Sequence, residues 1–432
     1  MQGQKDNLLS LPCCVTLHIF HFVDSFSLCI LLRAHRSFRV PVTEACLRAQ
    51  KLLRPLGIHR TADLSLLHLA QTQANVKIYR GKVSAGGNFT AVVSDASRLW
   101  TFGEGKDWRL AAGDGNSSHT ALAVSGAIAD LNIDSVSCGD NFGAVLTATG
   151  EVFLFGSLRT TKDQPLEHVP FPEGVRVMSV CCGGLSSVAV GESGEVFTWG
   201  RNTYGQLGHN NLTDSPVPRS VQGLERIVNV ACGHGHTAAV CSVGKLWTFG
   251  DGEGGRLGHG DHHWRPRPTL VTRLLHARTS YVACGVAYTV AVTPSGALYS
   301  WGRGGHGRLG HGDEFDRLVP TAVAGLRGVD ISSADCGIAH TAAVTVDGKL
   351  YTFGHAGDGR LGHGSDGVLE DELVPRLVKA LDSTAVAAVA CGFDHTVVTA
   401  RDGRVFTFGW GGSGQLGHGS WKTVNVPTCL ES

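Results

Sequence analysis

The sequence lacks both a net charge and a long basic run. Its 432 residues contain 37 Lys and Arg against 37 Asp and Glu. A nucleic-acid-binding tail is typically a run of positive charges that neutralises phosphates, and no such run occurs here. We therefore expect no direct contact with nucleic acid.

Cysteine pairs with the C-x-x-C spacing are also missing. The 13 cysteines include no C-x-x-C pair, and their number is odd. Six of them occupy one equivalent position in successive repeats: Cys138, Cys182, Cys232, Cys284, Cys336 and Cys391. Because neighbouring sheets lie about 10 Å apart, such positions are too distant for a disulfide. We expect free, buried thiols in a reducing compartment, and so a cytoplasmic or nuclear protein.

The sequence also lacks the motifs of common enzymes and a convincing membrane segment. It has no Gly-x-Ser-x-Gly elbow, no phosphate-binding Gly-Lys-Ser/Thr loop and no His-Glu-x-x-His helix. The apolar stretch Cys13–Leu32 contains His18, His21 and Asp24, which are costly in a bilayer. These absences predict a binding protein without catalytic residues, cofactor, metal or membrane contact.

Glycine, in contrast, is abundant, with 58 residues, and it marks a repeat. A small residue or Cys precedes a Gly, then come an alternating apolar run, an aromatic strand end and a Gly-rich turn. The anchor glycines are Gly86, Gly139, Gly183, Gly233, Gly285, Gly337 and Gly392, spaced by 53, 44, 50, 52, 52 and 55 residues. A period of this size indicates a solenoid, a propeller or an array.

Each repeat contains four candidate strands. In the clearest copy the first three are Ile227–Cys232, His236–Cys241 and Lys245–Gly250. Fourth strands are expected near the prolines of Pro216–Arg219, Pro268–Val271 and Pro320–Val323, since a missing N–H is tolerated at a sheet edge. Four strands in each of seven units predict an all-β, seven-bladed β-propeller over residues 76–432.

These repeats resemble the regulator-of-chromosome-condensation repeat family, whose members are seven-bladed propellers. The resemblance rests on Trp247-Thr-Phe-Gly, Trp301-Gly, Phe353-Gly and Phe408-Gly, each followed by Leu-Gly-His-Gly. The first two repeats depart from it, with Arg109-Leu-Ala-Ala-Gly and Ser157-Leu-Arg-Thr-Thr at the turn. We expect the fold to persist there with a different loop surface.

Histidine and arginine recur within the repeats. Eight histidines occupy two equivalent positions: His209, His259, His311, His363 and His418 in the turns, and His236, His340 and His395 at strand starts. Ligands of a metal must converge on one point, whereas equivalent residues lie on a ring, so we expect structural histidines bonded to neighbouring backbone. Arg256, Arg308 and Arg360 could line one face as a basic arc and bind a partner; alternatively, each is solvated and its stem covers a tryptophan or a phenylalanine.

Residues 1–75 do not repeat, and their apolar spacing predicts a small all-α module. The module contains, in order, Leu11-Pro12, Ile19-Phe20, Phe22, Asp24, Ser27-Leu28-Cys29 and Arg36-Ser-Phe38. This order of residues resembles an F-box, the motif that docks on the Skp-type adaptor of cullin–RING ubiquitin ligases. The resemblance implies that five side chains contact the adaptor: Leu11, Pro12, Ile19, Phe20 and Phe22. Cys13 and Cys14 stand where the family commonly has acidic residues. The alternative is a helical cap packed on the propeller.

Together, the two parts suggest the substrate-recognition subunit of a Skp/cullin/F-box ubiquitin ligase, with a protein substrate on the propeller. The first alternative is a guanine-nucleotide exchange factor for a Ran-like small GTPase; the second is a chromatin or cytoskeletal scaffold. A light sensor like the plant UV-B photoreceptors of this fold is disfavoured. Those carry Gly-Trp-Arg-His-Thr at the second strand, where this chain has segments such as Gly233-His-Gly-His-Thr.

Overall fold

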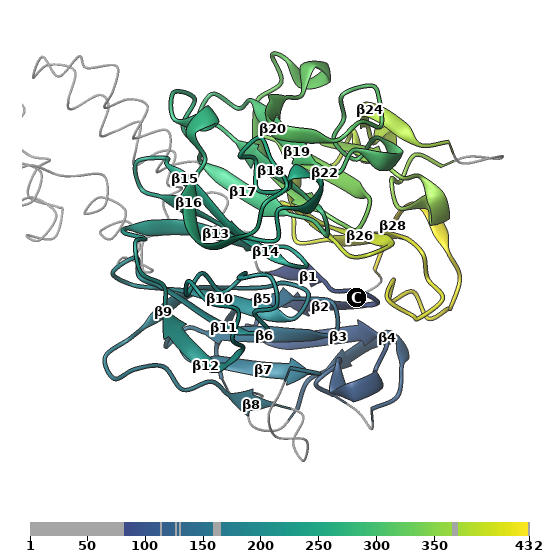
Figure 1. Ribbon diagram of the computed structural model, residues 1–432. Coiled ribbons are helices and arrows are strands. Elements are labelled where there is room, and N and C mark those ends of the chain that lie inside the picture. Colours follow the sequence, from purple (N-terminus) through teal and green to yellow (C-terminus); the bar gives the residue numbers. More distant parts are fainter. Residues whose placement is uncertain are drawn as a thin grey trace, which may run out of the picture. The chain divides into compact units, whose positions relative to one another are not determined.

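Short apolar strands that end in glycine form seven four-stranded antiparallel sheets (Figure 1). The computed structural model describes residues 82–112, 115–125, 128, 131–158, 166–364 and 370–430. The proposed helical F-box-like module at 1–75, with all five of its adaptor-binding candidates, lies outside these residues.

Each sheet, or blade, is built from consecutive strands of one repeat. Blades one to three comprise β1 (Val83–Ala85), β2 (Phe89–Val93), β3 (Leu99–Gly103), β4 (Ser118–Ala123); β5 (Ile133–Cys138), β6 (Phe142–Thr147), β7 (Val152–Gly156), β8 (Glu167–His168); and β9 (Val177–Cys182), β10 (Ser186–Gly191), β11 (Val196–Gly200), β12 (Ser215–Ser220). Blades four and five comprise β13 (Ile227–Cys232), β14 (His236–Cys241), β15 (Leu246–Gly250), β16 (Arg265–Leu270); and β17 (Tyr281–Cys284), β18 (Tyr288–Val292), β19 (Leu298–Gly302), β20 (Arg317–Ala322). Blades six and seven comprise β21 (Ile331–Cys336), β22 (His340–Thr345), β23 (Leu350–Gly354), β24 (Glu372–Leu377); and β25 (Val386–Cys391), β26 (His395–Ala400), β27 (Val405–Gly409), β28 (Val424–Cys429).

Short 3-10 helices occupy the connections between strands. They are η2 (Lys106–Trp108), η3 (Glu253–Gly255), η4 (Thr272–Leu274), η5 (Gly305–Gly307), η6 (Ala324–Leu326), η7 (Gly357–Gly359) and η8 (Lys379–Leu381). Among the helices in the described ranges, none has the length and apolar character needed to span a bilayer.

The strand predictions hold closely in blade four. β13 and β14 have the predicted bounds, and β15 begins one residue later than expected. β16 is the outer edge strand, as its prolines predicted, although it begins at Arg265 rather than near Pro268. The irregular first two repeats keep four strands each, and β8 is reduced to two residues.

The first strands of neighbouring blades contact one another around the centre, and β1 contacts β25, so the seven blades close a ring. The predicted all-β, seven-bladed propeller is therefore confirmed. The sequence left the closure open. Among the described strands, blades one and seven share none, because each consists of consecutive strands of its own repeat. A cluster of Val83, Ala85, Ala390 and Val397 joins them instead.

The repeated anchor glycine makes room for a ring. A Cβ on Gly233 would lie 2.3 Å from Cε1 of His236, and a Cβ on Gly285 would lie 2.3 Å from Cε1 of Tyr288. Both distances are far shorter than a van der Waals contact. The side chain three residues after the anchor thus packs directly over the glycine, which explains why glycine recurs there.

The aromatic strand end and the Leu-Gly-His turn form one interlocking device. The last aromatic residue of each third strand is almost completely buried: Phe102, Phe155, Trp199, Phe249, Trp301, Phe353 and Phe408. The turn of the preceding blade lies against this ring in several blades. A Cβ on Gly258, for example, would lie 2.8 Å from Nε1 of Trp301. Gly417 of blade seven approaches Phe102 of blade one in the same way, which adds to the closure.

None of the cysteines in the described part of the chain is in a disulfide bond, as predicted. Burial raises the pKa of the Cys138 thiol to about 12, and burial also raises the pKa values of Cys182, Cys336 and Cys391 well above the usual range. Because the thiolate is the reactive form of cysteine, these four thiols are inert packing groups.

Candidate functional site: the loop face of the propeller

One end of each sheet carries two sets of loops. In blade four, His236 pairs with Gly250, so the turn 233–235 and the connection 251–264 leave the sheet from the same end. The equivalent pairs Tyr288–Gly302 and His340–Gly354 give blades five and six the same arrangement. We call the surface formed by these turns and connections the loop face.

Five repeat histidines hold the long connections in shape. Thr248 Oγ1 donates its hydrogen to the Leu257 carbonyl at 2.7 Å, so the Nε2–H of His259 donates to the same hydroxyl oxygen at 2.9 Å. The arrangement recurs at His209, His311, His363 and His418. Burial, followed by the charge of Arg265, lowers the pKa of His259 and keeps it neutral. The predicted structural role is confirmed, but the partner is a hydroxyl rather than backbone.

The other three repeat histidines join adjacent blades. His236 Nε2 lies 2.9 Å from Thr289 Oγ1 of blade five, whose hydrogen is donated to the Arg256 carbonyl at 2.8 Å. His340 contacts Thr396 in the same way at 3.0 Å. His395 of blade seven contacts Thr90 of blade one at 2.9 Å, and this bond lies across the closure.

The three arginines proposed to bind a partner lie in these connections. Only 5% of Arg256 and 3% of Arg360 is exposed. The Nε of each donates to a carbonyl of its own turn, and Nη1 of each reaches a carbonyl of the next blade, that of Val286 or Phe393. Arg308, which is half-buried, does the same.

All three arginines clamp neighbouring blades together, and neither a solvated stem nor an open basic arc describes the buried Arg256 and Arg360. The half-buried Arg308 also lies over the Tyr288 ring, with its Cζ 6.0 Å from the ring centroid. Arg256 also pairs with the buried carboxylate of Asp251 at 2.8 Å. Their contact with a partner stays a prediction, and their geometry provides no exposed charge for it at Arg256 or Arg360.

Large apolar side chains stand exposed on the connections of four blades. They are Leu212 (50% exposed), Trp264 (49%), Phe315 (73%) and Trp421 (47%), which we call the apolar loop set. Each lies between the third and fourth strands of its blade, in segments whose sequences differ between copies. Trp264 stacks edge-on against Tyr204 of blade three, with ring centroids 5.4 Å apart. The set therefore gives the loop face a surface suited to protein contacts.

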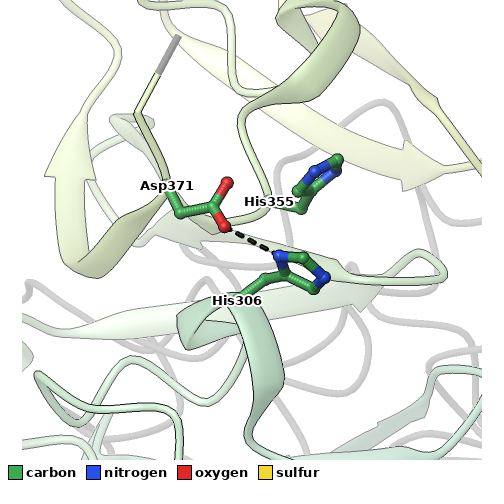
Figure 2. Close-up of side chains that lie close together, drawn as sticks. All are labelled: His306, His355 and Asp371. Carbon is green, nitrogen blue, oxygen red and sulfur yellow. Dashed lines mark hydrogen bonds and ion pairs between the residues drawn. The ribbon is translucent and has the colours of Figure 1, made fainter.

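A cluster of titratable groups lies between blades five and six on the same face (Figure 2). His306 of η5, His355 after β23 and Asp371 before β24 place one ligand atom each within 4.8 Å of one another. His306 Nδ1 lies 2.8 Å from Asp371 Oδ2, and the two imidazole rings meet edge-on at 4.4 Å between centroids. Burial, followed by the charge of Arg360, lowers the pKa of His355, so this ring is neutral at pH 7.

Sequence reasoning missed this cluster because it considered histidines at repeat-equivalent positions. Neither His306 nor His355 belongs to the repeated phrase. The sequence signal that could have found it is a histidine at a position where the other copies of the repeat have a different residue. Blade four, for example, has Gly254 at the position equivalent to His306.

Comparison with known proteins agrees with this architecture. The sequence profile of the RCC1-like domain matches residues 65–337, and that of the regulator of chromosome condensation (RCC1) repeat matches 347–399 and 402–432. The chain is 36% identical over 348 residues to the ultraviolet-B receptor UVR8 of Arabidopsis thaliana, covering 78% of this chain and 67% of that protein. It is 38% identical over 254 residues to human HERC4, a probable E3 ubiquitin-protein ligase, covering 59% of this chain and 19% of HERC4.

Solved structures share the fold at low identity. Prp20p of Saccharomyces cerevisiae superposes with a TM-score of 0.71 at 21% identity, over 83% of this chain and 89% of that chain. Human WBSCR16 gives a TM-score of 0.68 at 23% identity, over 78% and 94%. The sequence profiles, the UVR8 match and the seven four-stranded blades together show that the chain belongs to the family of RCC1-like propellers.

Proposed function

We propose that this chain is a protein-binding propeller that selects a protein substrate for a cullin–RING ubiquitin ligase in the cytoplasm or nucleus. The single observation that carries the binding role is the apolar loop set on the loop face. In this proposal the F-box-like segment contacts a Skp-type adaptor, and the chain itself makes or breaks no bond.

The chemistry of the loop face supports protein recognition. Aromatic residues are enriched at the centres of protein interfaces, where a few of them carry most of the binding energy. Phe315 and Trp264 project from neighbouring blades and are flanked by two ion pairs, Arg265–Asp261 at 2.6 Å and Arg317–Asp313 at 2.7 Å. An apolar centre with a charged rim is the usual composition of such a surface.

The relatives support the link to ubiquitin transfer. HERC2 is an E3 ubiquitin-protein ligase and HERC4 is a probable one, and this chain is similar to a part of each. The alignment spans only 19% of HERC4 and 5% of HERC2. The match therefore does not assign the ligase activity of those proteins to this chain. Photoreception, which the UVR8 name denotes, is disfavoured for this chain, because Trp199 and Trp301 are buried third-strand residues.

The adaptor contact is tested by co-purification of the full chain with a Skp-type adaptor. We expect the wild-type chain to retain the adaptor and Leu11→Ala/Pro12→Ala to lose it, since buried apolar contacts dominate such docking. Retention of the propeller fold, checked by circular dichroism, shows that the loss is local. Absence of binding by the intact chain would remove the ligase proposal.

The substrate surface is tested by replacing Trp264 and Phe315 with serine in the full chain. We expect at least a tenfold loss of the proteins that the wild type retains after cross-linking and mass spectrometry, while adaptor binding is unchanged. Val243→Ser is the matched control, since Val243 is 49% exposed but lies in the β14–β15 turn, at the opposite end of the sheet. Equal retention by all three proteins would reject the loop face as the binding surface.

The alternative function is nucleotide exchange on a Ran-like small GTPase. The fold shared with Prp20p, whose structure is described together with its binding to Gsp1p and histones, supports it. A nucleotide-release assay with purified GTPases distinguishes the two functions, because an adaptor leaves the release rate unchanged. Acceleration would place exchange ahead of substrate selection.

A further inference from the structure

We propose that His306, His355 and Asp371 form a binding site for a divalent transition metal of the Zn²⁺ class between blades five and six (Figure 2). The site stands apart from the proposed function, and its presence does not depend on a ubiquitin ligase role.

The ligand chemistry selects the class of metal. Imidazole suits Zn²⁺ and its transition-metal neighbours, whereas Mg²⁺ and Ca²⁺ prefer oxygen ligands alone. Two histidines and one carboxylate are also a common protein ligand set of zinc sites that keep an open fourth position. His306 is about half-exposed and Asp371 partly exposed, so that position is open to solvent on the loop face.

The distances require only small side-chain movements. Zinc bonds of about 2.0–2.2 Å separate the ligand atoms of a tetrahedral site by about 3.4 Å. His306 Nδ1 and Asp371 Oδ2 are 2.8 Å apart, and all three ligand atoms lie within 4.8 Å of one another. The ion would take the place of the hydrogen between His306 and Asp371, and neutral His306 would then carry its hydrogen on Nε2.

Asp371 is already oriented for this role. Its Oδ1 accepts a hydrogen bond from the Ala356 backbone N–H at 2.9 Å, in the way that Asp316 caps Gly304 in blade five and Asp214 caps Asn202 in blade three. The repeated cap fixes the carboxyl group and leaves Oδ2 directed at His306. Such outer hydrogen bonds orient ligands in known metal sites.

His306 lies at a left-handed turn position that several copies of the repeat share. Its φ is +63°, and at the equivalent position Gly254 has φ +67°, Asp358 +60° and Asp107 +57°. The turn conformation is therefore a property of the repeat. In blade five it places the His306 ring beside a second histidine and a carboxylate of the next blade, so that a bound ion would connect the two blades.

The test is a calorimetric titration of the full chain with Zn²⁺, with the bound stoichiometry measured by equilibrium dialysis. We expect the wild type to bind one more Zn²⁺ than His306→Gly, and Zn²⁺ to raise the melting temperature of the wild type more than that of the variant. His306→Gly keeps the backbone in a conformation that glycine favours, so it folds. Cysteines and histidines elsewhere contribute equally to both proteins and cancel in the difference.

Two further variants define the site. Asp371→Asn keeps an oxygen for the Ala356 cap but removes the carboxylate. Loss of a residue that only hydrogen-bonds to a metal ligand lowers metal affinity by about 10- to 100-fold, and we expect this variant to lose more Zn²⁺ affinity than that. His263→Ala removes an exposed histidine beside Asp261 on blade four and leaves binding unchanged. Equal Zn²⁺ stoichiometry and equal melting shifts in the wild type and His306→Gly would overturn the proposal, as would an equal response to Mg²⁺.

Discussion

Replacement of Gly302 with alanine is expected to lower the free energy of unfolding by about 3–5 kcal/mol, which is a large share of the total stability of a typical domain. Gly302 ends β19 with φ +112°, outside the region that alanine adopts readily. A Cβ there would lie 2.5 Å from Cα of Tyr288 and 2.7 Å from the Ala287 carbonyl oxygen. Both are backbone atoms of the neighbouring strand region, so no side-chain rotation relieves the overlap.

The matched control is Gly223→Ala. Gly223 also has a positive φ, +82°, but a Cβ there meets nothing within 4 Å. It therefore bears only the conformational cost of about 1 kcal/mol. Denaturant unfolding of the three proteins, followed by tryptophan fluorescence, separates the steric cost from the conformational cost. Equal destabilisation by both changes would show that the overlap of a Cβ at position 302 with the backbone of Tyr288 and Ala287 does not lower the free energy of unfolding.

Acidification is expected to unfold the propeller through its buried histidines. Burial, followed by the charge of Arg360, lowers the pKa of His395 from 6.5 to about 3. The unfolded chain thus binds this proton at a higher pH than the folded chain does. The contribution of the neutral His395 to the free energy of unfolding is fully present above pH 6.5. It decreases as the pH falls toward about 3, by about 1.4 kcal/mol per pH unit for each such histidine.

Burial lowers the pKa values of His236 and His340 in the same direction, so the three losses add at mildly acidic pH. Denaturant midpoints measured across this range give the slope. His395→Gln removes one titrating group, and we expect the slope to fall by about 1.4 kcal/mol per pH unit. An unaltered slope in His395→Gln would mean that this ring is charged in the folded state.

The fold was predictable from the sequence because its determinants recur. Gly233 and its equivalents leave room for the ring three residues later. The buried aromatic residue of each third strand ends a run of alternating apolar residues. The glycine and the aromatic residue recur in every copy, so they can be recognised as a sequence motif. Ring closure was not predictable. It depends on contacts such as His395 with Thr90, which are 305 residues apart.

The surface was less predictable than the core. Arg256 reads as a candidate binding residue because it is charged and follows a Gly-rich turn. In the structure it is buried, and its guanidinium donates a hydrogen bond to the carbonyl of Val286 in the next blade, 30 residues further along the chain. The cluster of His306, His355 and Asp371 combines non-equivalent positions of two blades, so neither the period nor the consensus reveals it.

The closure of the ring without a shared strand has a consequence for the order of events during synthesis. Each blade can form as soon as its own four strands have left the ribosome, because none of them waits for a strand from the far end of the chain. The apolar side of the first blade, with Val83 and Ala85, nevertheless has to wait for Ala390 and Val397. The nascent propeller therefore exposes this apolar, aggregation-prone surface of blade one during most of its synthesis, until the last repeat covers it.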